Sequence, residues 1–481
     1  MPRNNFYLTT TLPYVNAPPH IGFALEITRA DILARYHRLL GDEVFFNTGT
    51  DEHGLKIYRA AQKEGKEPQK YVDEYAAKFD NLKQALNLSY DSFIRTTDPH
   101  HLSAAQEFWK RCEKNGDIEK KTYKVKYCVG CELEKTDSEL VDGRCPIHPE
   151  LEIEIIEEEN YFFKFSKYQK PLLEFYENRP DFVVPETRLH EIKKFVESGL
   201  EDFSISRLKE KMPWGVPVPG DEDHVMYVWF DALVSYISAL GWPEEKKKFE
   251  EFWGTQKSPN AIQFAGKDNL RQQSAMWQAM LFSAGLPNSK QIYIEGFITT
   301  SGQKISKSSG KIIDPFELVE KYGTDAVRYY LARHIHPFED SDFTEEKFRE
   351  AYNAHLANGL GNLVARVMKL AETNLKEPIS PPASAPFAKE YTDAIEAFEF
   401  NKAMDFVWEK IQALDRRIAE EQPFVVVRDD IEKGKTLIAE LLKELYWIGR
   451  MLYPFMPTAS VAIKEAVKSN KMPESLFPRL D

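Results

Sequence analysis

The stretch Phe6-Tyr7-Leu8-Thr9-Thr10-Thr11 consists of aromatic, hydroxyl and aliphatic side chains that favour a β-strand. A turn containing prolines and an asparagine follows at 13–19, and apolar residues then recur at helical spacing over 23–37. A second strand begins at Val44-Phe45-Phe46 and ends at Gly49-Thr50-Asp51-Glu52-His53-Gly54. A strand, a helix and a strand at this spacing predict a parallel α/β sheet.

This α/β pattern is interrupted once along the chain and then replaced by helices. Residues 57–115 are expected to be helical, and from about 118 to 221 cysteines, turns and acidic runs break the pattern. Strand-like stretches resume at 225–231, 261–268 and 291–296. One sheet domain is therefore predicted to be split by an insertion. After residue 323 we expect helices, including 351–370, 400–420 and 431–452, with a proline-rich loop at 378–386.

Composition limits the classes of function. The chain has 481 residues, 42% of them apolar, and a net charge of −13, which argues against a general nucleic-acid binder. No apolar run reaches the roughly 18 residues of a membrane span, and the first residues lack a secretory apolar region. Four cysteines suit a reducing compartment, so we expect a cytoplasmic protein without a membrane partner.

Cysteines and a histidine form two short pairs, Cys128-x2-Cys131 and Cys145-x2-His148. Two such pairs joined by a loop can converge on one tetrahedral Zn²⁺ ion, and four protein ligands make the site structural. Unrelated buried thiols and a nucleic-acid-binding ribbon are the alternatives. The position inside a split α/β domain favours a structural knuckle. Cys112 is expected to be a core thiol.

Two separated stretches carry residues that suit phosphates. His20-Ile21-Gly22 follows the first turn, where a helix begins, and Lys304-Ile305-Ser306-Lys307-Ser308 suits a loop that closes on a nucleotide. His20 can donate to a phosphate oxygen, Gly22 leaves room for adenine, and Lys304 and Lys307 supply positive charge. These stretches resemble the two ATP signatures of class I aminoacyl-tRNA synthetases.

A third candidate for the nucleotide is Gly266-Lys267-Asp268, at the end of a predicted strand. Open α/β sheets bind ligands at the carboxyl ends of their strands. Asp268 can accept hydrogen bonds from the ribose hydroxyls, and it can equally cap the following helix.

Over nearly its whole length the chain resembles the methionyl-tRNA synthetase family. The resemblance rests on 11–16, 20–22, 50–54, the cysteine knuckle, 228–232, 266–268 and 304–308. It implies a Rossmann-type catalytic domain split by a zinc-containing insertion and followed by an all-α helical bundle. The implied divisions are 1–117 and 222–323 for the catalytic domain, 118–221 for the insertion, 324–350 for a stem-contact segment and 351–481 for an anticodon-binding domain.

The same resemblance implies activation of L-methionine by ATP with Mg²⁺ and transfer to methionine tRNA. Asp51 would hold the substrate amino group. The thioether pocket would be walled by Leu12, Tyr14, Trp229 and Tyr236. Packing in an ordinary core is the alternative for Trp229 and Tyr236. The insertion is too short for the editing domain of the valine, isoleucine and leucine enzymes, and the first strand lacks the cysteine of the cysteine enzyme.

In the helical region, Asn362 and Arg366 lie four residues apart and match the family's anticodon-reading pair. Phe424 would be a base-stacking platform, with a helix-start staple as the alternative. No tRNA-binding appendix follows, so we expect a monomer.

The chain also departs from the family pattern. Phe23 stands where the ATP signature has a second histidine, and Phe424 where relatives have tryptophan. Asn269, Gln272 and Gln273 replace pocket residues that are commonly Ile, Phe and His. These departures keep two other hypotheses open: a catalytically impaired tRNA-binding paralogue, and a nucleotidylyltransferase of the same superfamily.

Overall fold

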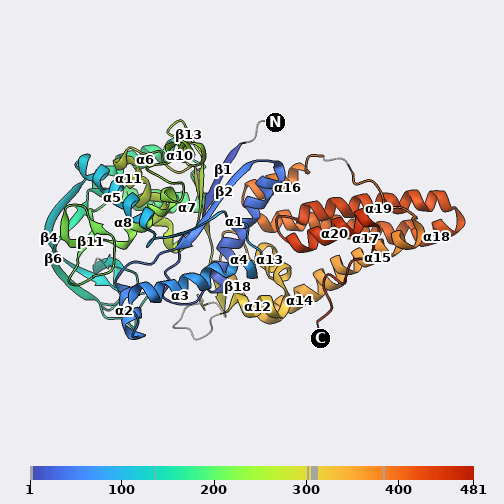
Figure 1. Ribbon diagram of the computed structural model, residues 1–481, viewed down its shortest axis with the longest axis horizontal. Helices are drawn as coiled ribbons and strands as arrows, with labels where there is room; N and C mark the ends of the chain where they lie inside the picture. The colour runs from blue at the N-terminus through green and yellow to red at the C-terminus, as the bar shows by residue number, and fades with distance from the viewer. Residues whose placement is uncertain (1–3, 136, 301–302, 305–312, 383–384, 481) are drawn as a thin grey trace. The chain divides into compact units, whose positions relative to one another are not determined.

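The computed structural model describes residues 4–135, 137–300, 303–304, 313–382 and 385–480. The chain divides into two compact units (Figure 1). Unit 1 comprises 1–19, 41–81 and 90–295, and unit 2 comprises 20–40, 82–89 and 296–481. Within the described residues, every helix is too short or too polar to cross a bilayer.

A parallel sheet forms the centre of unit 1, as predicted. In spatial order its strands are β3 (Ser92–Arg95), β2 (Glu43–Thr50), β1 (Asn5–Thr9), β14 (Ala261–Gly266), β15 (Gln291–Glu295) and β7 (Val183–Val184). The register pairs Tyr7 of β1 with Phe45 of β2 and with Ala261 of β14. The two halves of the split domain therefore meet along β1. The order of strands reverses there, which makes the β1–β14 junction the expected ligand site.

Smaller antiparallel sheets and helices complete unit 1. The remaining strands are β4 (Ile118–Cys128), β5 (Leu133–Lys135), β6 (Glu154–Phe163), β8 (Phe203–Ser204), β9 (Ser206–Leu208), β10 (Pro217–Val218), β11 (Asp221–Met226), β12 (Gly254–Thr255) and β13 (Ser258–Pro259). The helices are α2 (Leu55–Lys63), α3 (Pro68–Asp80), α5 (Pro99–Lys114), α6 (Gln169–Asn178), α7 (Glu186–Glu197), α8 (Val228–Ala232), α9 (Ser235–Ser238), α10 (Lys246–Phe252) and α11 (Trp277–Ala284). β7 lies inside the range predicted as the insertion, so part of that range completes the sheet.

An aromatic core holds the helices of unit 1 on the sheet. Trp109, Trp253 and Trp277 are fully buried. The ring of Phe108 on α5 stacks on Trp277 at 5.5 Å, and Tyr7 of β1 lies 6.1 Å from Trp253. Burying each such ring contributes about 1.5–3 kcal/mol, so the packing fixes the strand ends that carry the site.

Unit 2 consists mainly of helices, as predicted for the C-terminal region. They are α1 (Ile21–Leu40), α4 (Leu82–Ala85), α12 (Pro315–Tyr322), α13 (Thr324–Arg333), α14 (Glu345–Ala351), α15 (Asn362–Asn374), α16 (Lys389–Glu396), α17 (Phe400–Glu421), α18 (Pro423–Asp429), α19 (Ile431–Leu452) and α20 (Pro457–Ser469). α17, α19 and α20 run side by side (Figure 1). A small sheet contains β16 (Ile298–Thr300), β17 (Gln303–Lys304) and β18 (Ser341–Asp342).

Some predicted elements differ from the observed ones. β3 lies within the range 57–115 that was expected to be helical, so this expectation was wrong at Ser92–Arg95, where pairing with β2 holds a short strand. The stretch 225–231 was expected to be a strand, but β11 ends at Met226 and α8 begins at Val228. The helix predicted over 351–370 is present, with a π-helical segment at Tyr352–Gly361.

Candidate active site

A pocket in unit 1 opens at the carboxyl ends of the central strands. Leu12 follows β1, Asp51 follows β2 and Asn269 follows β14. The backbone N–H of Asp51 donates to the carbonyl of Pro13 at 3.0 Å, which joins the two turns. The lining residues are Thr11, Leu12, Asp51, Trp229, Ala232, Leu233, Tyr236, Asn269 and Gln273. The pocket therefore lies at the reversal of strand order, where α/β sheets bind ligands.

The apolar wall of this pocket comes from two short helices. Trp229 lies on α8 and Tyr236 on α9, and the carbonyl of Tyr236 accepts a hydrogen bond of 2.6 Å from the hydroxyl of Tyr7. Tyr14 was predicted as a wall residue but does not line the pocket. Its ring packs edge-on against Trp229 at 6.3 Å, so it contacts a residue of the wall.

Asp51 places a carboxylate in a pocket whose other lining residues are uncharged. It is 3% exposed, and Oδ1 of its side chain accepts a long hydrogen bond of 3.5 Å from the backbone N–H of His53. Burial, and next the nearby Asp231 carboxylate, raise the pKa of Asp51 well above its usual range. Among the described residues no cationic side chain forms an ion pair with Asp51. The pocket is thus suited to a ligand that brings its own positive charge.

Residues on either side of Asp51 fix the loop that presents it. Arg95 donates to both carboxylate oxygens of Glu52, at 2.6 and 2.9 Å, and the Glu52 side chain is fully buried. The indole N–H of Trp214 donates to the Glu52 carbonyl at 2.6 Å. A bidentate pair of this kind sets orientation as well as energy, so Glu52 anchors the loop.

His53 makes the second anchor. Its Nδ1 lies 2.9 Å from Oδ2 of the fully buried Asp231, and its ring meets Trp214 edge-on at 5.7 Å. Burial raises the pKa of Asp231, and His53 opposes that shift. Within residues 50–54, Asp51 therefore lines the pocket, whereas the side chains of Glu52 and His53 hold the loop that carries Asp51.

Gln273, one of the unusual amides, also lines the pocket. Its Nε2 donates to the Tyr236 hydroxyl at 2.6 Å, and its Oε1 accepts from Gln263 at 3.2 Å. Both polar ends of this buried amide are therefore hydrogen-bonded within the protein. Asn269 also lines the pocket, whereas Gln272 is buried in the π-helical turn Gln272–Met276 without lining it.

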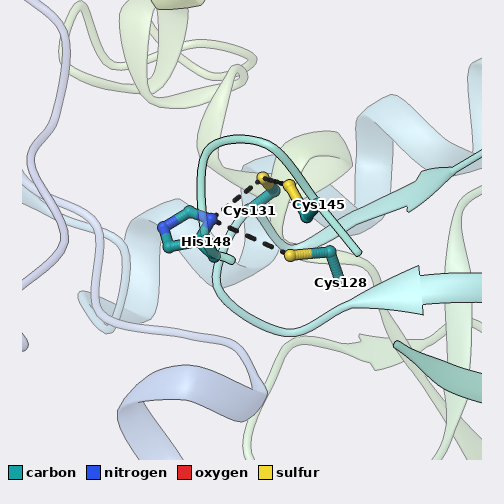
Figure 2. Close-up of side chains that lie close together, drawn as sticks. All are labelled: Cys128, Cys131, Cys145 and His148. Carbon is teal, nitrogen blue, oxygen red and sulfur yellow. Dashed lines mark hydrogen bonds between the residues drawn. The ribbon is translucent and has the colours of Figure 1, made fainter. Parts of the chain in front are cut away.

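The cysteine–histidine cluster converges as predicted (Figure 2). The ligand atoms of Cys128, Cys131, Cys145 and His148 all lie within 4.8 Å of one another. Nδ1 of His148 is 3.2 Å from Sγ of Cys131 and 3.8 Å from Sγ of Cys128. Such spacings fit four ligands around a tetrahedral Zn²⁺ ion with bonds of about 2.0–2.3 Å. A Cβ on Gly130 would lie 2.5 Å from the imidazole, so glycine lets His148 approach.

In unit 2, His20 directly precedes the long helix α1. Its Nδ1 accepts a hydrogen bond of 3.0 Å from the backbone N–H of Gly22, and a Cβ at Gly22 would stand 2.9 Å from the ring. Because Nδ1 is an acceptor here, a neutral imidazole carries its proton on Nε2. His20 therefore caps the helix and has its donor atom on the other side of the ring. Phe23 is buried on the same helix.

The other nucleotide candidates fall at strand ends. The backbone of Lys304 lies in β17, paired with Thr299 of β16, whereas Lys307 lies outside the described residues. In unit 1, Gly266 ends β14, and Asp268 is exposed in the single turn Lys267–Asn269.

The three predicted anticodon residues lie on neighbouring helices of unit 2. Asn362 and Arg366 lie on α15, which packs against α18, and Phe424 is at the start of α18. Arg366 forms an ion pair with Asp415 of α17. Phe424 is 44% exposed.

Comparison with known proteins decides the family. The model of the family described as tRNA synthetases class I (M) matches residues 6–152 and 149–368. The methionine–tRNA ligase of Thermotoga maritima is 40% identical and covers 97% of this chain, and the match spans 76% of that relative. That of Nostoc sp. is 42% identical over 95% of this chain and 89% of the relative.

The chain belongs to the methionine–tRNA ligase family.

Solved structures of this family agree with the fold. Mycobacterium tuberculosis methionyl-tRNA synthetase in complex with methionyl-adenylate aligns with a TM-score of 0.88 at 33% identity, over 99% of each chain. The apo form of that enzyme aligns with a TM-score of 0.82 at 30% identity, over 100% of this chain and 99% of that one. The predicted class I aminoacyl-tRNA synthetase is confirmed, and these findings favour it over a nucleotidylyltransferase.

Residues that sequence reasoning missed surround the methionine–tRNA ligase pocket. Thr11, Ala232 and Leu233 line it; Thr11 is adjacent in sequence to the predicted Leu12, and Ala232 and Leu233 lie between the predicted Trp229 and Tyr236. Glu52 and His53 were recognised only as part of a motif, because their partners Arg95 and Asp231 are remote in sequence.

Proposed function

We propose that this chain activates L-methionine with ATP and transfers the methionyl group to methionine tRNA. The methionine carboxylate attacks the α-phosphate, and pyrophosphate leaves as methionyl-adenylate forms. A hydroxyl at the 3′ end of the tRNA then attacks the acyl carbon, and AMP leaves. The observation that carries the proposal is the buried Asp51 carboxylate, which forms no ion pair with a cationic side chain of the described residues, in the pocket of a chain from this family.

In this proposal Asp51 holds the substrate ammonium group. Leu12, Trp229 and Tyr236 enclose the thioether, and Tyr14 packs against Trp229. Sulfur is polarisable and makes favourable contacts with aromatic rings, so this wall suits methionine. Anchoring the ammonium and the side chain leaves the carboxylate of the substrate as the group that reaches ATP.

The proposed ATP ligands stabilise charge and form no covalent bond. Nε2–H of His20 donates to a phosphate oxygen, because Nδ1 is engaged by Gly22. Lys304 and Lys307 neutralise the phosphates of the leaving group together with Mg²⁺. Gly266 and Asp268 receive the ribose, with the Asp268 carboxylate accepting from its hydroxyls.

Zn²⁺ is the metal we propose for the cluster of Cys128, Cys131, Cys145 and His148. With all four positions taken by protein, the ion would cross-link the two ends of the knuckle and take no part in the reaction.

The test of the proposed function is ATP–pyrophosphate exchange with each amino acid in turn, followed by aminoacylation of tRNA. We expect exchange with methionine alone and charging of methionine tRNA. Exchange with none of the amino acids, together with retained tRNA binding, would show the impaired paralogue instead.

The affinity for methionine should depend on pH through Asp51. Above its raised pKa the carboxylate is charged and binds the ammonium group; below it, protons compete, and the dissociation constant rises up to about tenfold per pH unit. Affinity is thus lost as the pH falls. Equilibrium dialysis of methionine between about pH 5 and 8 measures this profile. Asp51→Asn should bind methionine weakly, with a dissociation constant that does not change with pH. A dissociation constant of the wild type that is independent of pH would contradict the prediction.

Phe424→Ala should weaken aminoacylation while leaving exchange unchanged. Phe424 is 44% exposed, whereas an apolar residue that staples the start of a helix would be buried. Losing one stacked base costs about 1–3 kcal/mol, or roughly 5- to 150-fold in kcat/KM for tRNA. Val461→Ala, an exposed apolar residue on α20, is the matched control and should change neither reaction. A parallel loss of exchange in Phe424→Ala would show a structural role.

A further inference from the structure

The helix that follows the Asp51 loop is capped by a residue from the metal knuckle. α2 begins after Gly54, which has no side chain and a φ of +104°. Oε1 of Glu132, the residue next to Cys131, accepts a hydrogen bond of 2.7 Å from the backbone N–H of Lys56. A Cβ on Gly54 would lie 3.2 Å from this oxygen. Glycine therefore admits the carboxylate, which supplies the cap that the local sequence lacks.

Glu132 is held rigidly for this contact. It is 1% exposed, and its other oxygen accepts a hydrogen bond from the Tyr127 hydroxyl. Arg207 lies over the Tyr127 ring at 5.0 Å and over the Tyr227 ring at 4.6 Å. The backbone of Glu132 has a φ of +52°, a conformation that non-glycine residues adopt rarely and only where the surroundings hold it. A bend at this position turns the carboxylate inward.

Lys56 connects the same knuckle to the wall of the pocket. Its Nζ donates to the carbonyl of Gly130 at 3.1 Å and lies 5.5 Å from the centroid of the Tyr14 ring. Tyr14 in turn packs edge-on against Trp229, which lines the pocket. Lys56 therefore contacts the knuckle at both ends: its ammonium group contacts Gly130, between Cys128 and Cys131, and its backbone N–H contacts Glu132, just after Cys131.

We infer that Glu132 is a positioning residue for the amino-acid site: through the start of α2 and through Lys56 it sets the Asp51 loop and the Tyr14–Trp229 wall. This rests on the proposed function of the pocket. A negative carboxylate at the start of a helix also favours the helix dipole, so the charge contributes as well as the hydrogen bond. The knuckle thus acts on methionine binding as well as on the fold.

Glu132→Gln keeps the size of the side chain and removes its charge. In ATP–pyrophosphate exchange we expect KM for methionine to rise roughly tenfold, the effect of a weakened cap, with kcat and KM for ATP within about twofold. Zinc content, measured by atomic absorption, should equal that of the wild type. Glu154→Gln is the matched control, because Glu154 reaches α2 only through an exposed ion pair with Arg59, and it should change none of these values.

The outcomes separate the alternatives. An unchanged KM for methionine in Glu132→Gln would overturn the inference. If kcat fell while this KM stayed unchanged, the role of Glu132 would be merely structural. Tyr127→Phe removes only the hydroxyl that holds Glu132 and should raise KM for methionine about two- to threefold. If Glu132→Gln does not fold, KM for methionine in Tyr127→Phe tests the inference instead, and an unchanged value would overturn it. Absence of methionine-dependent exchange in the wild type would instead refute the proposed function.

Discussion

Asp51→Asn is expected to lower kcat/KM for methionine in ATP–pyrophosphate exchange by about a thousandfold, equivalent to about 4 kcal/mol. The substitution keeps the volume of the side chain but leaves the substrate ammonium in a buried pocket without a counter-ion. Breaking a buried pair in this way costs far more than losing an exposed one, because the remaining charge has been removed from water. Most of the loss should appear in KM if the proposed role in binding is correct.

The same variant should be at least as stable as the wild type. Burial, and next the nearby carboxylates of Asp231, Glu132 and Glu52, raise the pKa of Asp51 in the free protein. Replacing the acid by a neutral amide removes the cost of holding a negative charge at this position. Thermal unfolding of the free protein measures this effect, and an unfolding temperature equal to or above that of the wild type is expected. Loss of function with retained stability is characteristic of a binding residue.

Asp181→Asn provides the control for both measurements. Asp181 is an exposed residue of unit 1, with 64% of its side chain accessible, and pairs with Arg179. Its replacement should alter exchange and stability little, since exposed pairs contribute about 0–1 kcal/mol. A reduction of less than about tenfold in Asp51→Asn would contradict the role of the carboxylate in holding methionine.

Local patterns in the sequence predict the first elements of the fold and some of the pocket. The strand at Phe6–Thr11, the helix over 23–37 and the second strand are short-range features, and the structure has them at β1, α1 and β2. The spacing of Cys128, Cys131, Cys145 and His148 similarly predicts that the four side chains converge, because a single loop can bring the two short pairs together.

Contacts between remote residues could not be predicted in this way. β3 is a strand only because β2 pairs with it, and its four residues carry too little periodicity to indicate that state. The stretch 225–231 has strand-forming side chains, yet tertiary packing places Val228–Ala232 in a helix. Glu132 and Lys56 are 76 positions apart, and neither residue type marks a helix cap at that separation.

A buried ion pair in unit 2 leads to the largest expected loss of stability. The Arg328 side chain on α13 is fully buried, and its Nη2 lies 2.8 Å from Oδ2 of the equally buried Asp31 on α1. It also donates to the carbonyls of Leu86, Pro454 and Phe455, at 3.0, 2.8 and 2.8 Å. A single guanidinium therefore satisfies one carboxylate and three backbone acceptors that water does not reach.

Arg328→Met should reduce the free energy of unfolding by about 3–5 kcal/mol, because methionine fills much of the volume but leaves Asp31 and the three carbonyls short of donors. Arg35, which also binds Asp31 at 2.7 Å, limits the loss but cannot replace the bonds to the carbonyls. Urea unfolding followed by circular dichroism measures the change.

Arg417→Met is the control: Arg417 pairs with Glu421, Glu440 and Glu444 at a more exposed position, and its loss should cost about 1 kcal/mol or less. Equal losses in the two variants would contradict the prediction, because they would mean that burial adds nothing to the Arg328 contacts.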